Sequence, residues 1–134
     1  MKESKQVIVM RLDLKNSNGH KVRTGKLIAQ GAHASMKAVL DQMVSKDGKM
    51  ILDLKDKALQ SWIDGKFTKI CVSVDSESEL FEIVNKAQLA GLTCALITDA
   101  GLTEFGGVPT RTCCAIGPNW AEDVDKITGH LKLL

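Results

Sequence analysis

FTKICVSVDSESELFEIVNKAQLAGLTCALIT, residues 67–98, predicts a strand, a helix and a second strand in succession. Residues 67–74 are rich in β-branched side chains, which favour strands. Ser76 and Glu79 then form a capping box, the sequence signature of a helix start. Residues 93–98 are a second apolar, β-like run. The stretch therefore predicts a β-α-β unit, the building block of α/β proteins.

Similar patterns extend this unit in both directions. Residues 5–12 (KQVIVMRL) predict an additional strand, and Thr24 is the predicted N-cap of a helix that runs to about Val44. After the unit, residues 110–116 (TRTCCAI) predict a last strand, which Gly117-Pro118 ends. The remaining features are short helices at 58–63 and 121–128, an unassigned stretch at 45–57 that is either a helical turn or a loop tucked against the body, and an apolar tail at 131–134 that packs on the body.

The order of these elements predicts the fold class. Strands that alternate with helices indicate an α/β protein with a mixed, mainly parallel sheet covered on both faces. The loop at residues 99–109 contains no predicted helix, so we expect the last strand to run antiparallel to the strand before it. A length of 134 residues suits a single domain spanning 1–134.

Composition narrows the class of protein. Hydrophobic residues make up 44% and charged residues 25%, which excludes disordered and collagen-like chains. The apolar runs are too short to cross a bilayer, and the N-terminus lacks a signal-peptide pattern, so we expect a cytoplasmic protein without membrane contact. The four cysteines lie in β-like runs without metal-ligand spacing, so we expect buried, reduced thiols, no metal site and no cofactor.

Charge is distributed unevenly along the chain. Residues 1–37 hold eight Lys or Arg against two acids, a net charge of +6, whereas the remainder holds ten against fourteen, a net charge of −4. Such a basic region can attract a polyanion, although it can also be an ordinary solvated loop. The basic side chains at its centre are Lys15, Lys21, Arg23 and Lys26, with His20 among them.

The predicted first helix carries a polar stripe. Its long polar side chains fall within one sector of the helix: Lys26, Gln30, His33 and Lys37. Apolar residues such as Ile28 and Met36 lie opposite and form the predicted core side. Small residues beside the stripe, including Gly31, would let a ligand or another chain approach closely. The stripe is thus either a solvent face or a binding face, and the sequence leaves a homodimer open.

Asp99 follows the third predicted strand directly. Ligands of largely parallel sheets bind outside the carboxyl ends of the strands, which is where Asp99 is expected to lie. Lys26 begins its helix at the same edge, so the two side chains either pair or contact one substrate. The alternative is that Asp99 only caps a turn.

Five motifs occur together in a recognisable order. They are R-x-D-L (11–14), G-K-x-x-A-Q-x-A-H-A-S (25–35), D-A-G-x-T (99–103), A-I-G-P (115–118) and T-G-x-L-K-L-L (128–134). Together they resemble the type-2 peptidyl-tRNA hydrolases, the archaeal and eukaryotic kind. The resemblance implies a four-stranded mixed sheet between helices, a three-layer α/β/α sandwich, and hydrolysis of the ester that joins a peptide to the 3′ ribose of tRNA.

The resemblance also implies roles for individual residues. It places Lys26, Gln30, Asp99 and Thr103 in the catalytic site, with Thr110 as the hydroxyl on the following strand. His33 matches the motif in position, and its role stays open between helix packing and the site. Phosphate contacts that bind substrate without base-specific recognition are expected from the remaining basic residues: Lys15, Lys21, Arg23 and Lys37.

The expected chemistry is attack by water. No Ser-His-Asp set is visible, so Asp99 is the candidate to orient or deprotonate a water, and Lys26 either stabilises the oxyanion or keeps Asp99 ionised. Two alternatives are a non-catalytic tRNA-binding module and a small-molecule hydrolase on the same fold. One difference from the family pattern is the segment 15–24, which is longer, more basic and without Met, and which could alter how tRNA is engaged.

Overall fold

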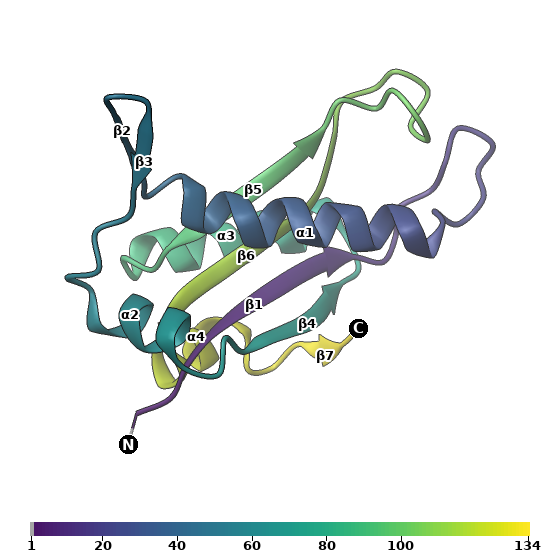
Figure 1. Cartoon of the computed structure of the whole chain (residues 1–134). Coiled ribbons are helices and arrows are strands. Elements are labelled where there is room, and N and C mark those ends of the chain that lie inside the picture. The colour runs from purple at the N-terminus through teal and green to yellow at the C-terminus, as the bar shows by residue number, and fades with distance from the viewer. Residues whose placement is uncertain (1) are drawn as a thin grey trace.

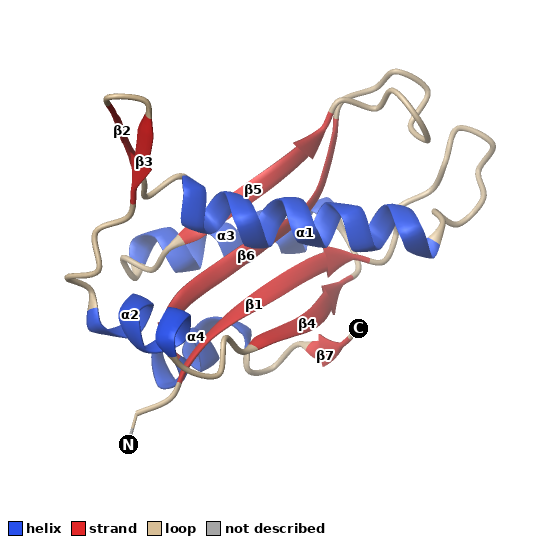
Figure 2. Cartoon of the chain, in the orientation of Figure 1, coloured by secondary structure: helices blue, strands red, loops and turns tan. Residues whose placement is uncertain are grey.

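Strands and helices alternate in the computed structural model, which describes residues 2–134 (Figures 1 and 2). Their bounds are β1 Ser4–Arg11, α1 Thr24–Leu40, β2 Val44–Lys46, β3 Lys49–Ile51, α2 Lys57–Asp64, β4 Lys69–Val74, α3 Glu77–Leu89, β5 Cys94–Asp99, β6 Thr110–Trp120, α4 Ala121–Thr128 and β7 Lys132–Leu133. The mixed α/β class predicted from the sequence is confirmed.

The main sheet has five strands in the order β5-β6-β1-β4-β7. The sheet is mixed, as predicted, and β6 runs antiparallel to β5, as predicted. The expectation of mainly parallel pairing is wrong, since β1–β4 is the one parallel pair described within residues 2–134. The reason is that β6 inserts between β1 and β5, which run in the same direction and would otherwise pair.

The expected count of four strands is also wrong. The apolar tail forms β7, in which Lys132 and Leu133 pair with Ser73 and Val72 of β4. The tail thus packs on the body by completing the sheet edge rather than by side-chain burial alone.

Strand β6 continues through Gly117-Pro118, contrary to the expectation that this dipeptide ends it. The Gly117 N–H donates to the Thr93 carbonyl at 2.8 Å, and beyond it Asn119 pairs with Lys5 across a register shift. Gly117 has φ +96, and a Cβ there would lie 2.5 Å from the Lys5 carbonyl oxygen. Only glycine fits this irregularity, which lets the strand bend and go on pairing.

Helices lie on both faces of the sheet (Figure 1). On one face, α3 and α4 pack on a core that includes Val7, Val9 and Cys114. On the other, α1 packs on a core that includes Met10 and Cys113. The neighbouring cysteines therefore face opposite sides, as the alternation of a strand requires.

Helix α1 turns a different side to the sheet than its sequence pattern predicts. Its buried residues are Gln30, Gly31, Ala34 and Ala38. A Cβ on Gly31 would lie 3.7 Å from the Ile8 side chain, in van der Waals contact, so the buried side of the helix lies close to β1. The predicted core side is exposed instead.

Residues 41–51 form a turn and a hairpin rather than the end of α1. The helix ends at Leu40, short of the predicted Val44, and β2 pairs with β3. Asp47 and Gly48 have φ of 53 and 75 between the strands, which is the type I′ turn that Asp-Gly favours. All six residues of β2 and β3 are exposed, so this part of the unassigned stretch does not tuck in.

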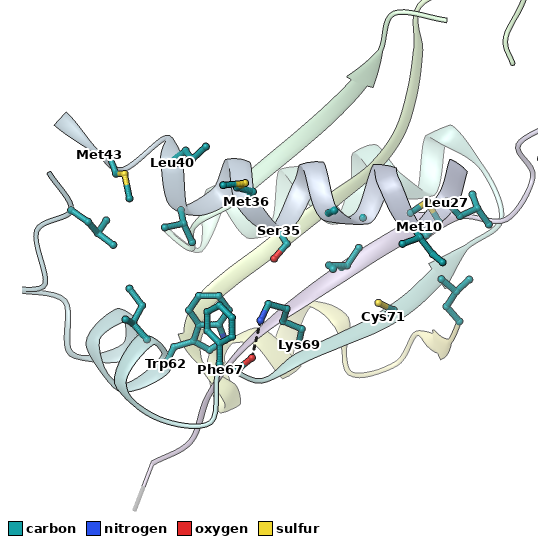
Figure 3. A pocket seen from close by; sticks show the side chains of 18 of the residues that line it. Met10, Leu27, Ser35, Met36, Leu40, Met43, Trp62, Phe67, Lys69 and Cys71 are labelled. Carbon is teal, nitrogen blue, oxygen red and sulfur yellow. Dashed lines mark hydrogen bonds between the residues drawn. The ribbon is translucent and has the colours of Figure 1, made fainter. Parts of the chain in front are cut away.

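The expectation of buried cysteines holds only in part. Cys113 and Cys114 are buried and Cys94 is half-buried, but Cys71 is exposed. Cys71 belongs to β4, on the part of the sheet that α1 leaves uncovered (Figure 3). No helix within residues 2–134 has the length and hydropathy to span a bilayer.

Candidate functional site

Two loops meet at the carboxyl end of β1 and β5. The β1–α1 loop (residues 12–23) and the β5–β6 loop (residues 100–109) lie side by side next to the start of α1 (Figure 1). β1 and β5 run in the same direction because both are antiparallel to β6. This common direction brings the residues after both strands to one edge of the sheet, as the sequence analysis expects.

Lys26 and Asp99 form the centre of the site. The Lys26 Nζ lies 2.9 Å from Asp99 Oδ1 and 3.0 Å from Thr103 Oγ1. The side chains of Lys26 and Asp99 are only 12% and 14% exposed, whereas Thr103 is exposed. Of the two arrangements left open by the sequence, the direct ion pair is the one observed. It is partly shielded from water, which strengthens it relative to a surface pair.

Gln30 extends this cluster into the protein interior. Its Nε2 donates to Asp99 Oδ1 at 3.1 Å, and its Oε1 accepts a 2.5 Å hydrogen bond from the Thr112 hydroxyl. Gln30 is 1% exposed and Thr112 is fully buried. Because the hydroxyl can only donate to the amide oxygen in this pairing, it fixes the amide with its NH₂ group toward Asp99.

The backbone of the β5–β6 loop holds the other oxygen of Asp99. The Gly101 N–H donates to Asp99 Oδ2 at 2.9 Å. Gly101 has φ +81, and a Cβ there would lie 2.1 Å from the Val108 carbonyl oxygen. The Gly107 N–H donates to the Gly101 carbonyl at 2.7 Å and closes the loop. The glycine of the D-A-G-x-T motif is thus required for the loop to close beneath the carboxylate.

The pKa of Asp99 is lowered from its usual value. Burial acts to raise this pKa, but the hydrogen bond from Lys26, the Gly101 N–H, the charge of Lys26 and the Gln30 amide together lower it more. Asp99 is therefore ionised at neutral pH and is a weak base. Asp13, at the end of β1, is engaged separately, since Arg11 binds it at 2.7 Å and its hydrogen bond lowers the pKa of Asp13.

Thr112 has no site role in the sequence prediction, although it is one of several threonines there with a hydroxyl to offer. The predicted hydroxyl is that of Thr110, which donates to the Val108 carbonyl at 2.9 Å, within the same turn of the loop. Both threonines lie on one side of β6, two residues apart, and they differ only in how far they are buried. The pattern T-x-T in the strand after D-A-G-x-T was the available signal, with the second threonine closer to the predicted core.

The other predicted residues lie around this cluster on exposed surface. His33 and Lys37 are exposed on α1, one and two turns beyond Gln30. Lys15 and Lys21 face each other across an isolated antiparallel bridge of the β1–α1 loop, and both are exposed. Arg23 binds Glu104 of the β5–β6 loop at 2.5 Å. The structure thus gathers the four predicted catalytic residues into one network and places Lys15, Lys21 and Arg23 at its rim, in the loop beside it, whereas Lys37 lies about three turns along α1 from Lys26 and binds Asp41 at 3.1 Å.

A hollow of the surface lies on the other side of α1. It has a volume of about 860 Å³ and is almost entirely apolar, with α1, α2 and β4 around it (Figure 3). Lys26, Gln30 and Asp99 do not line it. We call it the apolar groove. It is a surface separate from the charged cluster.

The cluster offers one free hydrogen-bond acceptor for a water and one free donor for a ligand. Asp99 Oδ1 already accepts two hydrogen bonds, whereas Oδ2 accepts one and keeps a lone pair for a water. Lys26 uses two of its three N–H groups and keeps one for an oxygen of a ligand. Residues 2–134 contain no group of three or more His, Cys, Asp or Glu placed to hold a metal ion.

Comparison with solved structures supports the fold. A protein of unknown function from Agrobacterium tumefaciens strain C58 has a TM-score of 0.58, with 15% identity over 100% of this chain and 99% of that one. At this identity the likeness shows the fold alone.

Comparison of sequences identifies the family. The model described as "Peptidyl-tRNA hydrolase PTH2" matches residues 4–134. Proteins named "Peptidyl-tRNA hydrolase" from Methanocaldococcus jannaschii and Thermococcus onnurineus are each 42% identical, over 97% of this chain and 99% and 97% of theirs. A Drosophila melanogaster protein named "Probable peptidyl-tRNA hydrolase 2" is 37% identical over 97% of this chain and 61% of its own length. Because these matches span almost the full length, the chain belongs to the peptidyl-tRNA hydrolase PTH2 family.

Proposed function

We propose that this hydrolase releases tRNA from peptidyl-tRNA by water attack on the ester at the 3′ ribose, and that the Lys26–Asp99–Gln30 network is where the reaction occurs. The observation that carries this assignment is an ionised, half-buried Asp99 held by three donors at the meeting point of two loops. A non-catalytic tRNA-binding module would not need such a network. A small-molecule hydrolase would not need the basic rim.

Asp99 orients the attacking water. Its Oδ2 accepts a hydrogen bond from the water and aims a lone pair of the water oxygen at the ester carbonyl carbon. Its lowered pKa makes it a weak base, so positioning contributes more than general-base strength. The proton that the water loses as its oxygen bonds to the carbonyl carbon passes to solvent, and solvent protonates the 3′ oxygen as the ester C–O bond breaks.

Lys26 stabilises the charge that develops on the ester. Its remaining N–H donates to the carbonyl oxygen as that oxygen becomes an oxyanion. Thr103 accepts from the same ammonium and has its own hydroxyl proton to donate, which suits the ribose or the leaving 3′ oxygen. Gln30 and Thr112 hold the carboxylate from inside. We assign Thr110 and His33 to the rim, where they contact substrate.

The tRNA backbone binds at the basic rim. Lys15 and Lys21 are exposed in the loop beside the cluster and Lys37 is exposed farther along α1, and all three are suited to phosphate contacts that accept many tRNA sequences. Arg23 lies at the same rim with its guanidinium already bound to Glu104. The enzyme works as one domain over residues 1–134, in the cytoplasm, where translation supplies the substrate.

A second copy of the chain covers the apolar groove in this proposal. Large apolar side chains around it are exposed, with Ile28 68%, Met36 63% and Phe67 51% accessible. The β2–β3 hairpin beside the groove is entirely exposed, and an isolated two-stranded hairpin has little stability in water. A hollow and a hairpin that exposes the apolar side chains of Val44, Met50 and Ile51 favour a two-fold, self-complementary interface.

Hydrolysis is tested with purified protein, peptidyl-tRNA and aminoacyl-tRNA, following the release of each tRNA. We expect peptidyl-tRNA to be cleaved, and Asp99→Asn to lower kcat by about 10²–10⁴-fold while tRNA still binds, since the amide keeps the shape but loses the charge. Asn can still accept from the Gly101 N–H, so an Asp99 that only closed the turn would tolerate the change. Wild-type-like turnover by Asp99→Asn would therefore reject the mechanism.

A further inference from the structure

Glu104 and Arg23 join the two loops that flank the site. The Arg23 Nε lies 2.5 Å from Glu104 Oε1, and the Arg23 backbone N–H donates to Glu104 Oε2 at 3.4 Å. We infer that Glu104 is a positioning residue which, through Arg23, clamps the β5–β6 loop to the start of α1 and thereby sets the geometry of the catalytic network. This inference rests on the proposed function.

The burial of Glu104 is the first observation behind it. Glu104 is 8% exposed, and carboxylates are seldom buried this far unless they are paired. Its partner Arg23 is the residue just before α1 and is 74% exposed. The buried carboxylate of Glu104 therefore lies in the β5–β6 loop, and the guanidinium that compensates its charge lies at the N-terminus of α1, the helix that carries Lys26.

Further contacts close the same joint. The Ser17 N–H donates to the Glu104 carbonyl at 2.8 Å, so the backbone of one loop holds the backbone of the other. A Cβ on Gly106 would lie 3.3 Å from the Ser17 Cβ, so the loops are in close contact there. Phe105 is 8% exposed in the core beneath α1, and its ring centroid lies 5.7 Å from the Lys26 Nζ. The loop is thus anchored at residues 104–106.

The anchor is adjacent to the catalytic residues in both loops. Glu104 follows Thr103, whose hydroxyl must lie 3.0 Å from the Lys26 Nζ, and Arg23 precedes Lys26 by three residues. The Arg23–Glu104 pair acts together with the Ser17 N–H and the buried Phe105 ring to hold Thr103 at that distance. A displacement of about 1 Å at a reacting group can lower a rate about 100-fold, so a joint of this kind controls turnover.

The clamp assigns Arg23 a role different from that of its basic neighbours. Lys15 and Lys21 are exposed cations without an acidic partner in the described structure, whereas the charge of Arg23 is compensated by Glu104. A phosphate-binding Arg23 would act mainly on substrate affinity. A clamping Arg23 acts mainly on turnover.

The experiment compares Arg23→Ala, Glu104→Ala and the double variant by kcat, KM and the affinity for deacylated tRNA. Arg23→Ala removes a cation and Glu104→Ala an anion, so pure electrostatics would change tRNA affinity in opposite directions. We expect each single variant to lower kcat by about tenfold or more. The kcat of the double variant should be no lower than that of the less active single variant, because both substitutions break the same pair. Lys21→Ala is the matched loss of a cation in the same loop and should raise KM more than it lowers kcat. Glu82→Ala is the matched loss of an exposed anion on α3 and should change neither.

A readout independent of catalysis separates this inference from the proposed function. Amide hydrogen exchange of residues 100–109 should accelerate in both single variants and stay unchanged in Lys21→Ala, whether or not the wild type cleaves peptidyl-tRNA. Glu104→Gln, which keeps the size and one acceptor, serves if the alanine variant does not fold. The clamp is overturned if loop exchange is unchanged, or if Arg23→Ala behaves like Lys21→Ala while Glu104→Ala keeps full turnover.

Discussion

At the scale of single residues, the Thr112 hydroxyl decides which way the Gln30 amide points. Thr112→Val keeps the shape and removes the donor, leaving a buried amide oxygen without its partner, at a cost of about 1–3 kcal/mol in the free energy of unfolding. The amide is then free to flip away from Asp99, and we expect kcat to fall about tenfold with little change in KM. Thr112→Ser restores the donor and should recover most of the turnover. Equal turnover in the Val and Ser variants would show that the hydroxyl does not position Gln30.

The pKa of Asp99 provides a second test at this scale. Lys26→Met removes the hydrogen bond and the positive charge that lower this pKa and leaves the burial that raises it, so the pKa of Asp99 should rise. In the wild type the lowered pKa stabilises the fold above the usual Asp value near 3.8, and this contribution is lost as pH falls through the lower folded value. Carboxyl ¹³C NMR measures the shift. Asp13, which Arg11 holds, is the internal control and should titrate unchanged.

Sequence reasoning was most effective at this scale because spacing carries geometric information. The helical period brought Lys26 and Gln30 onto one sector of α1, and strand direction brought Asp99 to their edge. The choice between Thr110 and Thr112 could not be made, since it depends on which of two like residues the helix covers. The Arg23–Glu104 pair was equally hidden, because 81 residues separate its members.

At the scale of elements, the β1–α1 loop carries exposed basic side chains next to the site. Lys15→Ala with Lys21→Ala removes two exposed cations, so we expect the slope of log affinity for tRNA against log salt to decrease in magnitude by about 1.5–2. KM should rise more than kcat falls. Lys86→Ala with Lys126→Ala, on α3 and α4, makes the same change in net charge on the other face of the sheet. If both double variants shift the slope equally, the loop is not part of the tRNA footprint.

Two elements show where sequence patterns mislead. On α1 the larger apolar residues suggested the core side, but Gly31, Ala34 and Ala38 pack on the sheet because only small side chains let a helix come this close. The Asp47-Gly48 pair was visible, yet the strands beside it are three residues long and fully exposed, so hydrophobic alternation gave no signal for a hairpin.

At the scale of the whole molecule, Cys71 reports on the apolar groove. A second copy seated in the groove would cover this exposed thiol, so its alkylation rate should fall as protein concentration rises. Ile28→Lys places a charge in the proposed interface. In this variant we expect an alkylation rate that does not change with protein concentration and a sedimenting species of 14.5 kDa, the mass of one chain. Peptide mapping distinguishes Cys71 from the half-buried Cys94. A Cys71 rate independent of concentration in the wild type would show that no second copy occupies the groove.

The order of the strands in the sheet is a part of the fold that the sequence did not predict. Alternation of strands and helices gave the α/β class, and the helix-free loop gave the direction of β6. The position of β6 between β1 and β5 was not encoded in any local pattern, because strand order depends on long-range pairing.

The central place of β6 has a consequence for synthesis on the ribosome. β1 and β5 have no contact through the sheet except by way of β6, which begins at residue 110 of 134. While the nascent chain is shorter than this, β1 and β4 can pair, but β5 has no strand to join and Asp99 has no fixed position relative to Lys26. The Lys26–Asp99 pair therefore forms only after β6 has left the exit tunnel, and we expect a translation product that stops before residue 110 to lack this pair.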